Sequence, residues 1–257
     1  MSAGRVGRAP VVLLALSLVI ALAWVLPPAQ VRIMPLGDSI TGAPGCWRAV
    51  LWHQLRAAGH TDLDFVGPRT GGACPLTYDR DHAGYSGYQA TRIAREDLLP
   101  SWLAVARPHI VLMHLGTNDL WHGAGTEAVL AAYAKLVGQL RARNPEVRIL
   151  LAQIIPMRAI GCDPCARRVL ALNRAIPGWA AQRSTARSPI TVVDQWTGFD
   201  AATDTIDGVH PNDTGFRKMA DRWLPAVTEA LSRRPPPGRG PPGSSAPGPG
   251  RDGALPR

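Results

Sequence analysis

Several features that mark large classes of protein are absent from the central part of the sequence. Residues 9–234 contain no run of lysine and arginine and no stretch in which aromatic and basic residues alternate, which argues against nucleic-acid binding. No segment is repeated along the chain, so a repeat architecture is not indicated. The four cysteines are not accompanied by further ligands at the spacing of a zinc site, and we expect neither a metal nor another cofactor.

The first 29 residues differ in composition from the rest of the chain. Arg5 and Arg8 give a basic start, residues 11–26 form an apolar run, and small residues lie at Ala21, Ala23 and Ala29. This order is typical of a secretory signal peptide. The apolar run is also shorter than the ~18 apolar residues expected of a membrane span, which favours a signal peptide over an anchor. An N-terminal anchor that is not cleaved is the alternative. Under either interpretation of residues 1–29 the domain faces the outside of the cell. We favour cleavage, and so expect a secreted or cell-surface protein without a membrane span in its mature form.

The C-terminal segment, residues 235–257, consists mostly of proline, glycine and serine. Such a segment buries little apolar surface, so we predict a disordered tail. The two ends carry four of the nine net positive charges, which leaves +5 on residues 9–234. With both ends discounted, the remaining length suits one globular domain, which we predict over residues 30–234. We expect this domain to be a monomer.

The four cysteines are Cys46, Cys74, Cys162 and Cys165. An even number in an exported protein predicts two disulfides, with three possible pairings. We expect the cysteines of the CDPC segment to close their own loop, which leaves Cys46 with Cys74. A thioredoxin-type redox role for CDPC is the weaker interpretation, because the segment follows a strand and Pro156 in a predicted loop.

Short apolar segments alternate with amphipathic segments through the domain. The apolar segments are strand-like and lie at residues 31–36, 63–67, 109–115, 147–155 and 190–194. The amphipathic segments predict helices at residues 46–59, 89–106, 126–143, 166–182 and 212–231, the second interrupted near Pro100. Strands this apolar, alternating with helices, belong in a parallel sheet covered on both faces. The sequence therefore predicts an α/β fold, a three-layer α/β/α sandwich around a five-stranded parallel sheet.

Polar loops follow three of these strands. They read GDSIT at residues 37–41, GTNDLWHG at 116–123 and DGVHPND at 207–213. Because parallel strands share one direction, we expect the three loops to meet at the carboxyl edge of the sheet, where ligands of such folds bind.

The residues of these loops suit acyl transfer. Ser39 is a candidate nucleophile, His210 a candidate general base, and Asp207 a candidate acceptor for the second ring N–H of the histidine. The side chain of Asn118 and the backbone N–H groups of Ser39 and Gly87 are candidate donors to an oxyanion. Taken singly, each loop is equally explained as a turn or a helix start. Their joint occurrence at predicted strand and helix boundaries favours a catalytic site.

Four segments carry a resemblance to a known family. IMPLGDSIT, DRDHAGYSG, HLGTND and DGVHP resemble, in order, the four blocks of the SGNH hydrolases, the GDSL-type esterases and lipases. The resemblance covers roughly residues 31–230, and DRDHAGYSG is similar to the branch that includes secreted acetyl xylan esterases. By contrast, residues 84–88 read GYSGY and do not match the G-x-S-x-G nucleophile elbow, so we interpret Ser86 as a turn residue.

The resemblance implies a flavodoxin-like fold and a mechanism. Ser39 would be the nucleophile, with His210 as base and Asp207 orienting it. The Ser39 and Gly87 backbone N–H groups and the Asn118 side chain would form the oxyanion hole. The reaction would be hydrolysis of a carboxylic ester through an acyl-enzyme, with no metal required.

Three functions are compatible with these residues. We favour a secreted esterase that removes O-acetyl groups from an acetylated polysaccharide or oligosaccharide. A general esterase or lysophospholipase acting on lipid acyl esters is the first alternative. A catalytically inactive module that binds a cell-wall polymer ranks last, because all the expected catalytic residues are present. Trp121 and His122 either line the substrate pocket or pack within their loop.

Overall fold

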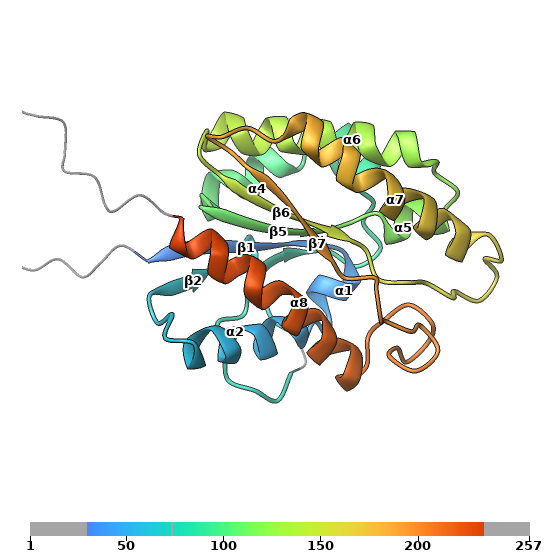
Figure 1. The fold of residues 1–257 in the computed structure, drawn as a ribbon, viewed down its shortest axis with the longest axis horizontal. Coiled ribbons are helices and arrows are strands. Elements are labelled where there is room, and N and C mark those ends of the chain that lie inside the picture. Colours follow the sequence, from blue (N-terminus) through green and yellow to red (C-terminus); the bar gives the residue numbers. More distant parts are fainter. Residues whose placement is uncertain (1–29, 73, 234–257) are drawn as a thin grey trace, which may run out of the picture.

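The computed structural model describes residues 30–72 and 74–233, so the predicted signal or anchor and the predicted tail lie outside the described residues. A sheet lies between two layers of helices (Figure 1). This architecture is the α/β/α sandwich that the alternating sequence pattern predicts.

Five parallel strands form the body of the sheet, at the positions of the five apolar segments. In sheet order they are β2 (Leu63–Phe65), β1 (Val31–Gly37), β5 (Ile110–His114), β6 (Arg148–Gln153) and β7 (Ile190–Asp194). All five residues of β5 are buried, as expected for a strand covered on both faces. The strands point the same way, so the loops that follow them gather at one edge of the sheet.

Two short strands extend the sheet where the sequence pattern shows only a loop. β4 (Asp81–Gly84) pairs in parallel with the end of β1, and β3 (Arg69–Thr70) pairs antiparallel with β4. Neither strand has an apolar run, so main-chain pairing rather than side-chain pattern fixes their place. Gly84 allows close packing here, because a Cβ at this position would lie 2.5 Å from the Gly42 nitrogen.

Helices cover both faces of the sheet. One face is covered by α2 (Trp47–Ala57) and α8 (Asp213–Ser232), and the other by α3 (Ala90–Arg95), α4 (Leu99–Ala106), α6 (Thr126–Arg143) and α7 (Cys165–Arg183) (Figure 1). Residues three or four apart in α8, such as Phe216, Met219 and Trp223, are buried against the sheet. Two short helices, α1 (Ser39–Gly42) and α5 (Thr117–Trp121), follow β1 and β5. Within residues 30–72 and 74–233, no helix combines the length and the apolar character needed to cross a bilayer.

Of the two disulfides predicted from the sequence, the structure contains one. Cys162 and Cys165 are joined by a disulfide at the start of α7, as predicted. Cys46 and Cys74 are both buried as thiols, and the predicted disulfide between them is not formed. Burial first, and then a hydrogen bond with the Cys74 side chain, raise the pKa of Cys46 to about 12, so the protonated thiol is the form that this site favours.

Candidate active site

The first candidate residue lies where β1 ends. Asp38 caps the short helix α1, because its Oδ1 accepts a hydrogen bond from the Ile40 N–H at 3.0 Å. Ser39 is the first residue of α1, and its Oγ lies 2.9 Å from Nε2 of His210. The turn is tight: a Cβ on Gly37 would lie 2.2 Å from the Thr41 hydroxyl oxygen. The strand end and its glycine therefore bring the Ser39 hydroxyl to the edge of the sheet.

The second pair of residues lies on the loop between β7 and α8. Nδ1 of His210 is 2.7 Å from Oδ2 of Asp207, and Oδ1 of Asp207 accepts from the backbone N–H of Val209 and of His210. Gly208 has a φ of +84°, and a Cβ there would lie 2.4 Å from the Arg158 carbonyl oxygen, so the turn requires glycine.

The protonation of this pair follows from its contacts. Partial burial raises the pKa of the Asp207 carboxyl, but hydrogen bonds from the His210 backbone and side chain and from the Val209 N–H outweigh that effect and lower the pKa overall. An ionised carboxylate only accepts hydrogen bonds, so Nδ1 of His210 carries the proton in the neutral ring. Nε2 is then an acceptor for the Ser39 hydroxyl.

The candidate oxyanion donors lie on two other loops. The side-chain nitrogen of Asn118, on α5, donates to the Tyr88 carbonyl at 3.1 Å. An amide nitrogen has two N–H donors, so this contact orients the group while its second N–H can serve another acceptor. Gly87, with a φ of +76°, is exposed on the turn that the Tyr88 N–H closes on the Tyr85 carbonyl. The N–H of Tyr85 donates in turn to the Gly37 carbonyl, so the turn is attached to the strand that carries Ser39.

Sequence reasoning missed Asp119, the residue after Asn118. It is fully buried, and its carboxylate accepts from the backbone N–H groups of Ala90 and Thr91 at 2.7 and 2.9 Å and from the Thr91 hydroxyl. These contacts join α5 to the N-terminus of α3 and so fix the position of Asn118. An aspartate next to Asn118 and a predicted helix start near residue 89 were the available signals.

Sequence reasoning also missed Arg48 of α2, which is fully buried. Its guanidinium donates to the carbonyls of Thr41 and Gly42 in α1, and to those of Gly71 and Arg80 in the loops beside it. Two of these contacts satisfy carbonyls at the end of α1, the other two attach α1 to the neighbouring loops, and burial lowers the pKa of the guanidinium. Arg48 therefore fixes the turn that carries Ser39.

Asp38 itself is an unusual neighbour for a nucleophile. The side chain is fully buried, and among the described residues Oδ2 has no hydrogen-bond partner. Burial is the largest effect and raises the pKa of Asp38 to about 7.

Other residues considered from the sequence have local roles. His114 is buried in β5, where its Nε2 accepts from the Ile155 N–H at 3.3 Å and burial lowers its pKa to about 4. Nδ1 of His82 accepts from the Gly84 N–H at 2.9 Å. Trp121 is partly exposed, and Nδ1 of His122 lies 2.7 Å from the Asn118 carbonyl oxygen. Within residues 30–72 and 74–233, no group of three or more His, Cys, Asp or Glu residues is placed to hold a metal ion.

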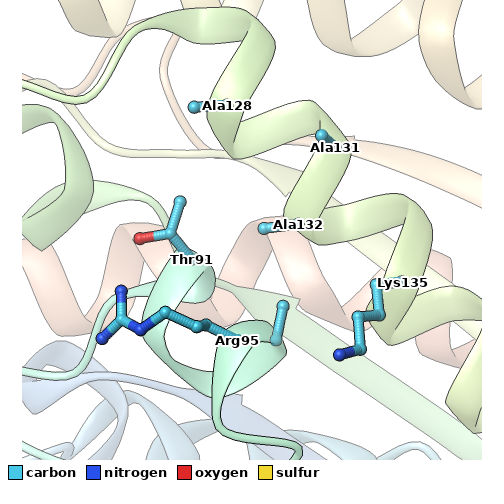
Figure 2. A pocket seen from close by; sticks show the side chains of 7 residues that line it. Thr91, Arg95, Ala128, Ala131, Ala132 and Lys135 are labelled. Atoms are coloured by element: carbon cyan, nitrogen blue, oxygen red, sulfur yellow. The ribbon is translucent and has the colours of Figure 1, made fainter.

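A hollow of about 270 Å³ lies between α3 and α6 (Figure 2). It is lined by alanines together with Thr91, Arg95 and Lys135. Both charged side chains have partners, Arg95 in Glu96 and Lys135 in Asp97. None of the candidate catalytic residues lines this hollow.

The fold and the site together define a class of protein: an α/β domain with a Ser–His–Asp constellation at the carboxyl edge of its sheet. Residues 36–218 match the model of the GDSL-like Lipase/Acylhydrolase family, and the chain belongs to that family. It is a carboxylic ester hydrolase by family.

Individual relatives are more specific. A multidomain esterase of Ruminococcus flavefaciens is 30% identical over 221 residues, which cover 77% of this chain and 28% of that protein. A carbohydrate esterase family 3 structure from Talaromyces cellulolyticus is 34% identical with a TM-score of 0.74, covering 80% of this chain and 100% of that one. A mutant acetyl esterase, solved with an acetate ion, is also 34% identical, with a TM-score of 0.73 over 79% of this chain and 99% of that one. The chain thus spans little more than a quarter of the multidomain relative but almost the whole of the two solved domains.

Proposed function

We propose that this protein is a secreted serine esterase that removes acetyl groups from carbohydrate through an acyl-enzyme. The observation that carries the proposal is the continuous contact from Ser39 through His210 to Asp207, with distances of 2.9 and 2.7 Å. A serine hydroxyl needs a neighbouring base to become a nucleophile, and the base needs a partner for its second N–H.

In the proposed reaction, Ser39 Oγ attacks the carbonyl carbon of the ester while Nε2 of His210 takes the hydroxyl proton. Asp207 keeps the imidazole in the required tautomer and stabilises its protonated form. The negative charge that develops on the carbonyl oxygen is received by the backbone N–H groups of Ser39 and Gly87 and by the Asn118 amide. His210 then gives its proton to the departing alcohol, and a water molecule activated by the same histidine releases the acid and restores Ser39.

The choice of acetyl esters on carbohydrate rests on the relatives. The 34% identical structures are an acetyl esterase and a family 3 carbohydrate esterase, and each is covered almost completely by this chain. An extracellular location agrees with a polymeric substrate outside the cell, and it rests on the sequence of residues 1–29. We propose residues 30–234 as the catalytic domain.

The test is release of acetate by the full chain from acetylated xylan and from a short-chain chromogenic ester. Ser39→Ala removes the proposed nucleophile, and Ser86→Ala, an exposed serine on a neighbouring loop, is the matched control. We expect release from both substrates, lost in Ser39→Ala and kept in Ser86→Ala. Activity that survives Ser39→Ala would overturn the serine mechanism. Activity that rises steadily from acetyl to octanoyl esters would replace the acetyl esterase with a lipid acyl esterase.

A further inference from the structure

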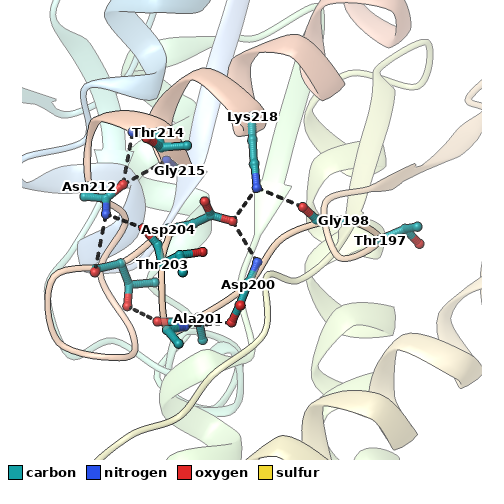
Figure 3. Close-up of polar contacts among 12 residues, drawn as sticks. Thr197, Gly198, Asp200, Ala201, Thr203, Asp204, Asn212, Thr214, Gly215 and Lys218 are labelled. Carbon is teal, nitrogen blue, oxygen red and sulfur yellow. Dashed lines mark hydrogen bonds and ion pairs between the residues drawn. The ribbon is translucent and has the colours of Figure 1, made fainter.

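A buried carboxylate lies in the loop that carries Asp207 and His210. The Asp204 side chain is 2% exposed, and its Oδ2 accepts from the Lys218 ammonium at 2.6 Å and from the Asp200 N–H at 2.7 Å (Figure 3). Nζ of Lys218 also donates to the Gly198 carbonyl at 3.0 Å. A single ammonium group on α8 thus connects two points of this loop through a charge-assisted contact.

The residues beside Asp204 continue these contacts to the candidate catalytic pair. The Asp204 carbonyl accepts from the Asn212 N–H at 2.9 Å. The hydroxyl of Thr205 donates to the Ala201 carbonyl and accepts from the Gly208 N–H at 2.7 Å. The N–H of Ile206 donates to the carbonyl of His210 at 2.9 Å. Direct hydrogen bonds therefore connect Asp204 and its neighbours to both sides of the Asp207–His210 turn.

Asn212 completes the arrangement at the start of α8. Its side-chain oxygen accepts from the N–H groups of Thr214 and Gly215, and its side-chain nitrogen donates to the Thr203 carbonyl (Figure 3). Lys218 lies six residues further along the chain, between one and two helical turns into α8. Asn212 and Lys218 therefore hold residues 198–204 from two positions, and the Asp207–His210 turn is the part of the chain between residue 204 and Asn212.

We propose that Asp204 and Lys218 are positioning residues for catalysis: their ion pair holds the loop so that His210 reaches both Asp207 and Ser39. The inference rests on the proposed function, because it assigns a role in that reaction. Asp204 and Lys218 touch no reacting atom and act through the placement of the imidazole. The structural reason is that residues 195–212 contain no helix or strand, so the position of Asp207 and His210 depends on contacts such as this ion pair.

Lys218→Met is the direct variant, since it keeps most of the apolar stem and removes the charge. Removing one partner leaves a buried carboxylate unpaired and lowers stability, so the neutral double variant Asp204→Asn with Lys218→Met is made beside it. Arg222→Met is the matched control. Arg222 lies one turn further along α8 and holds the start of the same loop, through the Asp194 and Thr197 carbonyls at 3.2 and 2.7 Å.

Two readouts separate positioning from general stability. The first is kcat and KM for a short-chain acetyl ester, measured well below the unfolding temperature of each variant. The second is the downfield proton resonance of the His210 Nδ1–H, which reports its hydrogen bond to Asp207. We expect Lys218→Met and the double variant to lose about 10- to 100-fold in kcat with KM nearly unchanged, because a misplacement of about 1 Å has effects of this size. The resonance is expected to weaken in both and to persist in Arg222→Met, whose kcat stays at the wild-type value.

The proposal is overturned if Lys218→Met and the double variant keep the wild-type kcat and resonance. It is also overturned if Arg222→Met lowers kcat as much as they do, since the loop would then need only general support. Esterase activity that is kept in Ser39→Ala would instead refute the proposed function. The His210 resonance would still report whether the Asp204–Lys218 ion pair positions His210.

Discussion

The two halves of the candidate site are held in different ways. Ser39 lies two residues after the end of the buried strand β1, and the fully buried Arg48 donates hydrogen bonds to its short helix α1. Asp207 and His210 lie on the long loop between β7 and α8, and their side chains are 47% and 26% exposed. Figure 1 shows this loop extending from the body of the domain. The sheet thus places the nucleophile, whereas the acid–base pair depends on hydrogen bonds within its own loop and on α8. We infer that the nucleophile side is fixed by the fold as a whole, and the histidine side by a few replaceable contacts.

The largest expected effect is on the nucleophile side. Ser39→Ala should lower kcat by about 10⁶-fold, the order seen when a triad serine is removed, because no other group supplies the attacking oxygen. Steady-state hydrolysis of a short-chain acetyl ester measures it. Since the loss is chemical, the unfolding temperature should stay near that of the wild type. A Ser39→Ala enzyme with more than a small residual activity would mean that another group attacks the ester.

Asp207→Asn tests the other half of the comparison. The asparagine keeps the size of the side chain but favours the wrong histidine tautomer, so we expect kcat to fall by about 10⁴-fold. Hydrolysis across a range of pH measures the effect on the working form of the enzyme. A loss of less than about tenfold would show that the backbone of the loop alone orients His210, and that the carboxylate is dispensable.

A smaller effect is expected where the oxyanion would be bound. Asn118→Ala should lower kcat by about 10² to 10³-fold and change KM little, since the amide donates chiefly to the transition state. The comparison variant is His122→Ala, which lies on the same loop and contacts only the Asn118 backbone in the described hydrogen bonds. Equal losses in the two variants would indicate damage to the loop, and an unchanged kcat in Asn118→Ala would remove Asn118 from the oxyanion hole.

Asp38→Asn tests how the buried carboxyl group next to Ser39 affects the stability of the folded protein. Burial raises the pKa of Asp38 from 3.8 to about 7, so the folded state keeps a proton that the unfolded chain releases. The stability contributed by this proton is complete below about pH 4 and is lost as the pH rises to about 7. Asparagine still caps α1 and does not titrate, so the variant should gain in free energy of unfolding relative to wild type across this window, by at most about 4 kcal/mol.

Denaturant unfolding of Asp38→Asn and the wild type at about pH 4, 5.5 and 7.5 measures that gain. A difference between the two proteins that does not change with pH would show that Asp38 is ionised in the folded state throughout. Such a result would contradict the account of its burial.

The sequence predicted the parts of the molecule that leave a pattern. The five apolar segments predicted the five parallel strands of the sheet body, and the loops after three of them pointed to the edge where Ser39, Asn118 and His210 lie. Strands β3 and β4 left no pattern, because they are short and contain no apolar run, and main-chain pairing to β1 and to each other places them in the sheet.

The roles of individual buried charged residues could not be predicted from the sequence either. Arg48 lies in an amphipathic segment like any surface arginine, and Asp204 lies in a loop rich in aspartate and threonine. Nothing in the neighbouring sequence shows that Arg48 binds four carbonyls or that Asp204 binds the ammonium group of Lys218. Only the tertiary structure brings these partners together. Cys46 and Cys74 show the converse error: an even cysteine count predicted a bond that the structure does not form.

The most direct test of the central claim is to identify the residue that becomes acylated or phosphonylated. The full chain is treated with a stoichiometric fluorophosphonate, and the modified peptide is located by mass spectrometry. We predict one label per chain, on Ser39, with loss of esterase activity in proportion to labelling and no labelling in His210→Ala. A label on Ser86 or on another residue, or full inactivation without modification of Ser39, would contradict the account.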